Sequence, residues 1–169
     1  MSDLRIGLGI DAHAFADDVP LVLGGVRFRS PRGLAGYSDG DVIAHALVDA
    51  LLGAAGLGDI GAMFPSDDER WKDVSSLDLL RRAYAQVKSC GYELVNADCV
   101  LIGEEPRIAG LHKEMEFLLG GALELGTRQQ VSVRATTTDR LGFTGRGEGL
   151  AAQAVALLRR VDGTTDVAG

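Results

Sequence analysis

The sequence has few cysteines, no long apolar run and no leader-like segment. Cys90 and Cys99 are the only cysteines among 169 residues and form no C-x-x-C motif, which excludes a disulfide framework and a thiolate metal site. We interpret both as reduced and structural. Asp, His or Gly interrupts every long apolar stretch, so none reaches the roughly 20 residues of a membrane span. The first residues lack the apolar core and cleavage site of a signal peptide. We therefore expect a cytoplasmic protein without a membrane partner.

Positive charge is scarce as well. Seventeen Lys and Arg stand against 24 Asp and Glu, which gives a formal net charge of −7. No run of Lys and Arg resembles a footprint for a nucleic-acid backbone, so we expect no nucleic-acid partner. An anionic small ligand would therefore need a local source of positive charge in its binding site.

Glycine is abundant instead. It accounts for 23 of the 169 residues, about 14% against a usual value of about 7%. The glycines gather at 24–25, 53–61 and 142–149. These places are junctions between expected elements, where the backbone must turn sharply or come close to something.

Hydrophobic periodicity predicts a single α+β domain over residues 1–160, followed by a disordered tail at 161–169. The expected strands are 4–10, 21–28 with a break at Gly24 and Gly25, 94–102 and 131–136. The expected helices are 38–52, 75–90, 111–122 and 150–158. The first helix opens on a capping box, Ser38 to Asp41. The strand at 94–102 should bury Val95 and every second residue after it. We expect the helices to lie in a layer on a small mixed β-sheet.

Three side chains have the spacing of a metal site. Asp11 and His13 stand two residues apart at the end of the first strand, so both point to one face. His45 lies on the first helix, with Asp41 and Asp49 one turn away on either side, where an acid can orient the imidazole by a hydrogen bond. A D-x-H pair alone is often a surface pair, and a lone helical histidine is often a core residue. Together the three would form a zinc site with an open fourth position.

A second candidate region runs from Ala135 to Gly149. Consecutive Thr hydroxyls and small-residue amides can donate to phosphate oxygens, and Asp139 can hold a hard divalent cation. The alternative is a plain glycine-rich loop after a β-branched strand end. The third histidine, His112, lies in a surface-like pattern, and we expect it to be solvated.

Taken together, these motifs resemble the 2-C-methyl-D-erythritol 2,4-cyclodiphosphate synthases of non-mevalonate isoprenoid biosynthesis. The resemblance runs from Ile6 to about Leu158, through G-I-D-A-H, L-G-G-V, S-D-G-D-V-I-A-H-A-L-V-D-A-L-L-G-A-A-G-L-G-D-I-G, G-Y-E-L-V-N-A-D, A-T-T-T-D and L-G-F-T-G-R-G-E-G. It implies a lyase acting on 4-diphosphocytidyl-2-C-methyl-D-erythritol 2-phosphate, whose 2-phosphate attacks the β-phosphorus of its own CDP group and expels CMP.

The resemblance also implies roles for individual residues. Asp11, His13 and His45 would bind Zn²⁺, and Asp139 would hold Mg²⁺ or Mn²⁺ between the substrate phosphates. Thr137 and Tyr37 would be catalytic. The implied substrate-binding residues are Asp11, Ala12, His13, Tyr37, Ser38, Asp59, Ile60, Gly61, Phe64, Pro65, Ser66, Asp67, Asp68, Gly103, Glu104, Glu105, Pro106, Arg107, Ile108, Ala109, Ala135, Thr136, Thr137, Thr138, Asp139, Phe143 and Arg146.

Within that set, the resemblance implies that 59–61 and 64–68 hold the methylerythritol. The loop 103–109, with Ala135 and Thr136, would hold the cytidine largely through backbone groups. The family implies a homotrimer with active sites between protomers, and a central channel at Arg146 and Glu148 where isoprenoid diphosphates bind.

The sequence departs from the family pattern at four positions. Tyr37 stands where a His is usual, Asp139 replaces a Glu, Ser66 an Asp and Arg107 a Lys. A phenol donates a hydrogen bond but is a poor cation near neutral pH. The shorter Asp139 would hold its cation closer to the backbone or through water. Two alternatives stay open: a zinc-dependent phosphohydrolase that gives linear products, and a diphosphate-binding module without turnover.

Overall fold

The computed structural model describes residues 3–126 and 129–161. Apart from Val161, the expected tail at 161–169 lies outside the described residues. The strands are β1 (Leu4–Asp17), β2 (Leu21–Leu23), β3 (Val26–Phe28), β4 (Arg32–Leu34), β5 (Tyr92–Ile102), β6 (Val131–Thr136) and β7 (Gly149–Arg160). The helices are α1 (Val42–Ala55), α2 (Ile60–Met63), a 3-10 turn (Glu69–Trp71), α3 (Ser76–Ser89), α4 (His112–Ala122) and α5 (Gly142–Gly145).

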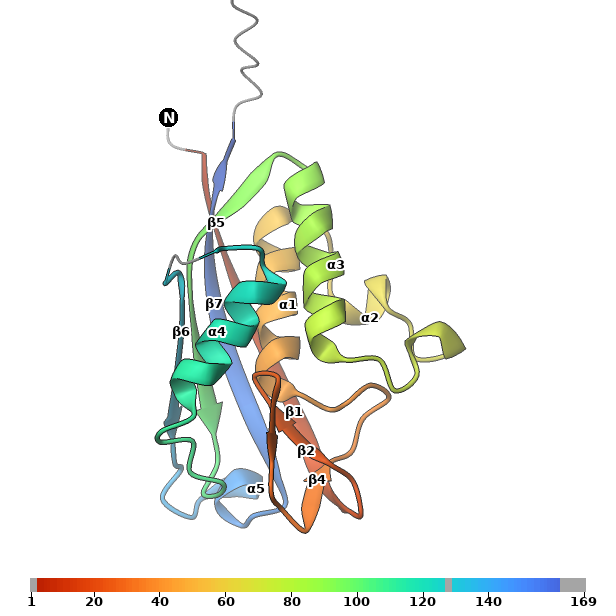
Figure 1. Cartoon of the computed structure of the whole chain (residues 1–169), viewed down its shortest axis with the longest axis vertical. Helices are drawn as coiled ribbons and strands as arrows, with labels where there is room; N and C mark the ends of the chain where they lie inside the picture. Colours follow the sequence, from red (N-terminus) through yellow and green to blue (C-terminus); the bar gives the residue numbers. More distant parts are fainter. Residues whose placement is uncertain (1–2, 127–128, 162–169) are drawn as a thin grey trace, which may run out of the picture.

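The strands form one mixed sheet with a layer of helices on one face. Its order is β4-β1-β7-β5-β6, in which β5 and β6 are parallel and the other neighbours are antiparallel. A separate ribbon pairs β2 with β3. Helices α1, α3 and α4 lie on the same side of the sheet (Figure 1). The prediction of one α+β domain with helices layered on a small mixed sheet is confirmed. No helix in the described part has the length and apolar character needed to cross a membrane.

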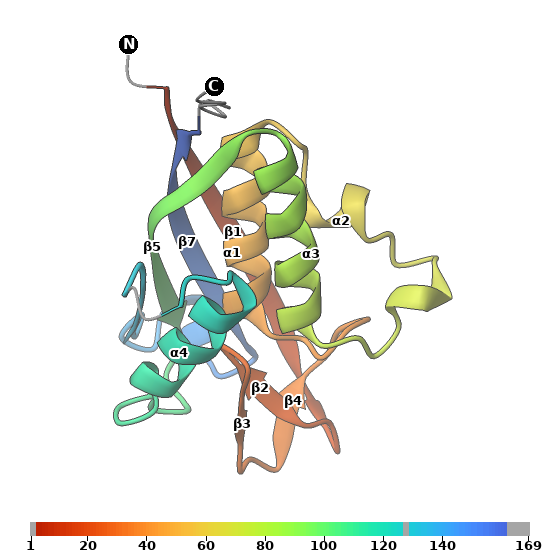
Figure 2. The same cartoon turned by 45° about the horizontal axis from the view of Figure 1, so that its top comes forward.

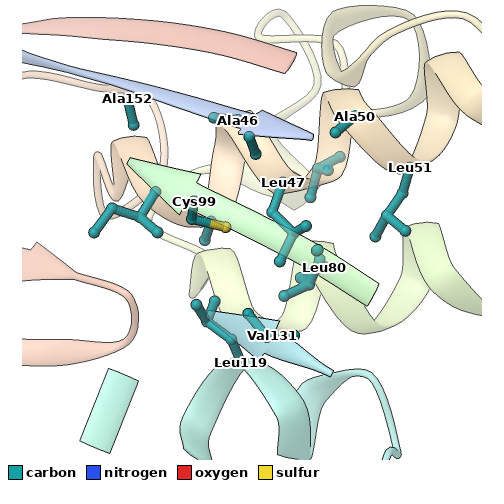
Figure 3. Close-up of a cluster of buried hydrophobic side chains, with 14 of the residues drawn as sticks. Ala46, Leu47, Ala50, Leu51, Leu80, Cys99, Leu119, Val131 and Ala152 are labelled. Carbon is teal, nitrogen blue, oxygen red and sulfur yellow. The ribbon is translucent and has the colours of Figure 1, made fainter. Parts of the chain in front are cut away.

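Helix α1 is the centre of the core. Eleven of its fourteen residues are buried, because the sheet covers one side and α3 the other (Figure 2). Its Leu47 and Leu51 pack with Leu80 of α3, and the cluster continues to Leu119 of α4 and Cys99 of β5 (Figure 3). A helix enclosed in this way is held in place from several directions, which gives its polar residues fixed positions.

Two glycines of β1 set how closely α1 approaches the sheet. A Cβ at Gly7 would lie 1.9 Å from the carbonyl oxygen of Ala50, and a Cβ at Gly9 would lie 1.9 Å from that of Ala46. Backbone therefore packs on backbone here, and only glycine fits at either position. Because strand side chains alternate, Asp11 and His13 continue the same face toward the start of α1.

The start of α1 is fixed by a buried carboxylate. The N-cap is Asp41, which corrects the prediction that Ser38 opens the helix. Asp41 accepts hydrogen bonds from Ile43 and Ala44 in α1 and from Gly24 and Gly25 in the β2–β3 turn, at 2.7–3.2 Å. Burial raises the pKa of Asp41 to about 6, although the backbone donors act in the opposite direction. One carboxylate thus joins the helix to the ribbon.

The predicted helix at 150–158 is wrong, since this segment is the central strand β7. Ala152, Ala154, Ala156 and Leu158 are buried, and Gln153 with the other residues between them are exposed or half-buried. Alanine and leucine are strong helix formers, but small side chains are what a strand needs directly beneath α1. The alternation of period two identifies the strand.

The buried face of β5 also differs from the prediction. Ala97, Cys99 and Leu101 are buried as expected, but Leu94 takes the place expected for Val95, which is only half-buried. The register to β7 shifts between Leu94 and Asn96. A bulge inserts one residue, so the alternation changes phase at that point.

The sheet face opposite the helices is apolar along β1. Leu4, Ile6, Leu8 and Ile10 are between 51% and 73% exposed, and Val155 of the adjacent strand is 44% exposed. A sheet face open to water normally alternates to polar residues. An exposed apolar patch of this kind indicates a contact surface.

The glycine contact predicts opposite effects for two Gly→Ala substitutions. Gly9→Ala places its Cβ against the α1 backbone, so we expect the free energy of unfolding to fall by about 1–3 kcal/mol or more. Gly53 lies on α1 with nothing within 4 Å of its Cβ position. Gly53→Ala should therefore raise stability by about 0.5–1 kcal/mol. Urea unfolding of the two variants and the parent measures both effects. Equal stability of the Gly9→Ala variant and the parent would disprove the contact.

Candidate active site

A cluster of three side chains lies where β1 meets the start of α1. Asp11 and His13 come from the face of β1 that α1 covers, and His45 comes from the first turn of α1. Asp11 Oδ2 is 2.9 Å from His13 Nε2 and 3.0 Å from His45 Nδ1. The two imidazole nitrogens are 3.3 Å apart. Ligand atoms of all three residues lie within 4.8 Å of one another. The prediction that the three residues converge is confirmed.

Each histidine of the cluster uses its second ring nitrogen on the protein. His13 Nδ1 donates to the carbonyl oxygen of Ala35, and His45 Nε2 lies 2.8 Å from Ser76 Oγ and 2.9 Å from Ser38 Oγ. These contacts fix the ring orientations, so His13 Nε2 and His45 Nδ1 face the cluster. Two imidazoles and a carboxylate, with room for a fourth ligand, fit the donor set of an open catalytic zinc site.

The charges in the cluster favour an ionised carboxylate beside the imidazoles. Burial alone would raise the pKa of Asp11, but hydrogen bonds with His13 and His45 and their charges outweigh it, so its pKa lies below the usual range. The hydrogen bond that His13 donates to Asp11 raises the pKa of His13, against the effect of burial. An ionised carboxylate beside two imidazole nitrogens is a set of ligand atoms that can bind a metal cation.

A cavity of about 190 Å³ opens beside the cluster, and we call it the metal-site cavity. Its lining residues are Asp11, His13, Tyr37, Ser38, His45, Ile60, Gly61, Phe64, Ser66, Trp71 and Leu79. Eight of these eleven belong to the substrate-binding set expected from the sequence, and His45 is the third expected zinc ligand. Phe64 and Trp71 form one wall, with ring centroids 5.0 Å apart in an edge-to-face arrangement.

Tyr37 is half-buried at the metal-site cavity. The loss of solvent around its ring and the negative charges of Glu69, Asp68, Asp67 and Asp73 raise its pKa above the ordinary value. Tyr37 therefore stays a neutral phenol near pH 7. It offers a hydrogen-bond donor at this place but no positive charge.

Asp49 does not meet His45 in the way that the helical spacing predicts. Its carboxylate accepts from the N–H of Ile60 at 2.7 Å and so holds the start of α2. Asp59 caps the same short helix through the N–H of Ala62. The two acids fix the backbone at Gly61, which lines the metal-site cavity.

A larger cavity of about 830 Å³ lies at the ends of β5 and β6, and we call it the loop cavity. Its lining residues are the loop Gly103–Ala109, with His112, Val133, Arg134, Ala135, Thr136, Thr137, Arg140 and Gly145. The fold thus brings the 103–109 loop together with Ala135 and Thr136, which the resemblance groups with it, and with Thr137, to which the resemblance gives a catalytic role. His112 is half-buried at this cavity, which corrects the expectation of a solvated side chain.

The turn that carries Asp139 lies beside the loop cavity, which is lined by Arg140 of the same turn. Asp139 and Arg140 both have positive φ, at 50° and 64°, and a Cβ at Gly145 would lie 2.1 Å from the backbone of Arg140. The N–H of Arg140 donates to Glu104 at 3.0 Å. Asp139 Oδ1 lies 3.4 Å from Thr137 Oγ1. The carboxylate is exposed and can therefore reach a cation that a ligand also contacts.

Some residues expected at the site line neither cavity. They are Ala12, Asp59, Pro65, Asp67, Asp68, Thr138, Asp139, Phe143 and Arg146. Ala12 alternates to the opposite face of β1 from Asp11. Asp68 pairs with Arg70 at the 3-10 turn, and Arg146 pairs with Glu148 at 2.8 Å.

Sequence reasoning missed Ser76, which contacts His45 of the cluster, and Asp39, which contacts Ser76. Ser76 comes from α3, thirty-one residues after His45, so no local spacing could reveal it. Trp71 and Leu79 were missed in the same way. For Trp71 the sequence offers one signal, since the single tryptophan of the chain stands three residues after the expected site segment 64–68.

We expect His45→Ala to empty the metal cluster. Loss of one of three ligands should weaken zinc binding beyond the roughly 10–100-fold that the loss of a ligand's hydrogen-bond partner causes. Zinc per chain, measured by elemental analysis after dialysis, should fall from about one to near zero. His112→Ala is the control and should keep its zinc. A His45→Ala variant with the parent's zinc content would show that the cluster is not the metal site.

Comparison with known proteins gives consistent matches. A model described as the YgbB family matches residues 4–159. The curated 2-C-methyl-D-erythritol 2,4-cyclodiphosphate synthase of Rubrobacter xylanophilus is 56% identical over 167 residues, which cover 97% of this chain and 100% of that protein. The solved structure of bifunctional IspDF from Campylobacter jejuni matches with TM-score 0.90 and 40% identity, over 96% of this chain and 44% of that one. A CDP complex of IspF from Plasmodium falciparum matches with TM-score 0.81 and 30% identity, over 96% of this chain and 99% of that one.

Proposed function

We propose the following function from the premise that this chain belongs to the YgbB family, whose curated relatives are 2-C-methyl-D-erythritol 2,4-cyclodiphosphate synthases. The chain is a lyase of the non-mevalonate isoprenoid pathway. It converts 4-diphosphocytidyl-2-C-methyl-D-erythritol 2-phosphate to 2-C-methyl-D-erythritol 2,4-cyclodiphosphate and CMP. The observation that carries this function is the convergence of Asp11, His13 and His45 beside a cavity of the residues that the family places there.

The reaction is an intramolecular phosphoryl transfer. An oxygen of the 2-phosphate forms a bond to the β-phosphorus, and the bond between that phosphorus and the bridging oxygen breaks. The bridging oxygen keeps the electron pair and leaves as part of CMP. No protein nucleophile is required, so the chain's task is to position the phosphates and to balance their charge.

We propose Zn²⁺ at Asp11, His13 and His45, and Mg²⁺ or Mn²⁺ at Asp139 with the substrate phosphates. When bound, the two cations would polarise the attacked phosphate and offset the charge on the leaving group. The donor set of the cluster supports zinc. The exposed carboxylate of Asp139 supports a hard cation shared with phosphate oxygens.

Hydroxyl groups would orient the phosphates around the cations. Tyr37 and Ser38 line the metal-site cavity and are suited to donate hydrogen bonds to the phosphate oxygens there. Thr137 lines the loop cavity next to Asp139 and is suited to stabilise the transition state. Since Tyr37 is neutral, its contribution is a hydrogen bond, and the positive charge must come from elsewhere.

The two cavities would divide the substrate between them. The backbone around Gly61, with Phe64 and Ser66, would hold the methylerythritol in the metal-site cavity. The loop Gly103–Ala109 would hold the cytidine, and the CDP complex of the Plasmodium falciparum relative supports a nucleotide of this kind. Arg107 and Arg140 add positive charge to the loop cavity.

We propose that the chain is a homotrimer with each active site between two protomers. The metal-site cavity and the loop cavity have no lining residue in common, so one chain alone offers the two halves of the site separately. The uncovered apolar face of β1 and β7 supports an assembly that buries it. A closed ring with head-to-tail interfaces would repeat the same composite site at each interface.

We propose a cytoplasmic location for the enzyme. The supporting observation is that Cys90 and Cys99 are both free thiols, as is usual for proteins of a reducing compartment.

The direct test of function is product analysis. Purified protein with Mg²⁺ and 4-diphosphocytidyl-2-C-methyl-D-erythritol 2-phosphate should release CMP and cyclic diphosphate in equal amounts, as followed by chromatography and phosphorus resonances. CMP with a linear phosphate would instead identify a hydrolase. Unchanged substrate in a zinc-loaded protein would identify a binding module.

Asp139→Ala should lower turnover and remove its dependence on Mg²⁺, since the variant lacks the carboxylate that holds the second cation. A loss of roughly 10²–10³-fold is the size seen when one group that stabilises developing charge is removed. Initial rates over a Mg²⁺ titration measure the effect. Zinc content should stay at the parent value. If the variant keeps the parent's rate and Mg²⁺ dependence, Asp139 is not the ligand.

A further inference from the structure

We propose that Ser76 is a positioning residue that fixes the tautomer of His45 and so presents His45 Nδ1 to the metal. This role depends on the metal centre proposed above. It extends that centre to a chain of hydrogen bonds, Asp39–Ser76–His45, that joins three separate segments.

Ser76 is the first residue of α3 and is completely buried. Its Oγ lies 2.8 Å from His45 Nε2 and also contacts Asp39 Oδ1. Its backbone N–H donates to Asp39 Oδ2 at 3.0 Å. Both oxygens of the carboxylate are therefore engaged by one residue, which fixes the position of the Ser76 hydroxyl.

This arrangement determines which group donates and which accepts in each hydrogen bond. A serine hydroxyl has one proton, and a carboxylate only accepts hydrogen bonds. The Ser76 hydroxyl must therefore donate its proton to Asp39. Toward His45 it can only accept, so His45 Nε2 must carry a hydrogen.

A neutral imidazole with hydrogen on Nε2 has its lone pair on Nδ1. In His45 that nitrogen lies 3.0 Å from Asp11 Oδ2 and 3.3 Å from His13 Nε2, inside the cluster. Without the Asp39–Ser76 contact, nothing would hold the hydrogen on Nε2 against the Asp11 carboxylate, which favours a hydrogen on Nδ1 in the zinc-free protein. A His45 with its hydrogen on Nδ1 cannot bind the metal through that nitrogen. A site that is competent for only part of the time has a proportionally weaker apparent affinity.

Ser38 provides a natural comparison. Its Oγ lies 2.9 Å from the same Nε2 of His45, but unlike Ser76 it has no carboxylate partner among the hydrogen bonds of the described residues. Ser38 also lines the metal-site cavity. Because Ser76 accepts the imidazole proton, the Ser38 hydroxyl remains able to donate to a ligand oxygen. At His45 Nε2, Ser76 thus accepts the hydrogen bond that fixes the tautomer, while the hydroxyl of Ser38 is available to a ligand.

The test compares Ser76→Ala with Ser38→Ala in the full-length protein. Zinc affinity is measured at pH 8 by competition with a chromophoric chelator. The tautomer of His45 is read from the nitrogen resonances of its ring in the zinc-free protein. We expect Ser76→Ala to weaken zinc binding about 10–100-fold and to give a mixture of tautomers. Ser38→Ala keeps the Asp39–Ser76 contact, so it should weaken zinc binding clearly less than Ser76→Ala does and should retain the Nε2–H tautomer.

Asp39→Asn is the second variant and serves if Ser76→Ala does not fold, which circular dichroism would reveal. The amide has one acceptor oxygen where the carboxylate has two, and its NH₂ group donates. The Ser76 hydroxyl is then free to donate to His45 Nε2, so the Nδ1–H tautomer should increase and zinc binding should weaken.

Parental zinc affinity in Ser76→Ala would overturn the proposal. So would a weaker affinity with an unchanged Nε2–H tautomer, since the effect would then not act through His45. Both measurements are made without substrate. Their outcome is therefore independent of whether the chain releases CMP, and a failure of either proposal can be told from a failure of the other.

Discussion

The close contact between α1 and β1 is the constraint on which the rest of the site depends. Gly7 and Gly9 let the helix backbone rest directly on the strand, and Asp41 fixes where the helix begins. Asp11 and His13 on the strand therefore lie directly beside His45 on the helix. All three residues belong to a strand or a helix, and none belongs to a loop. Rigid elements hold metal ligands more precisely than loops do, and the hydrophobic core around α1 keeps both elements in register.

A reaction between two phosphate groups needs positive charge beside them, and this chain has a formal net charge of −7. Among the described residues that line the metal-site cavity, none is Lys or Arg, and Tyr37 is a neutral phenol. The cluster therefore depends on a cation for its electrostatics. The loop cavity differs, because Arg107, Arg134 and Arg140 line it, although Arg134 is paired with Asp98 at 2.8 Å. Such a division is consistent with a substrate whose reacting phosphate lies at the metal and whose nucleotide lies in the loop cavity.

The sequence was most informative where a local pattern has a single physical meaning. The D-x-H pair on a strand and the histidine one turn into a helix predicted the cluster, since alternation and helical periodicity determine where those side chains point. Local patterns failed where the decisive partner is distant. Ser76 reaches His45 only through the packing of α3 on α1. The alanines of β7 favour a helix by intrinsic propensity, but the sheet needs small residues under α1, and packing overrode the propensity. The meaning of Gly7 and Gly9 likewise appears only when the helix is in place.

The central claim is that the metal-site cavity of one protomer and the loop cavity of another form one active site. Subunit complementation tests it most directly. His45→Ala removes the metal half and Thr137→Ala the nucleotide half, and each variant alone should be nearly inactive. Co-expressed with different tags and purified as mixed oligomers, the two should regain activity, because random assortment rebuilds about one quarter of the sites from two intact halves. Activity no greater than that of the separate variants would contradict the account and would assign the whole site to a single chain.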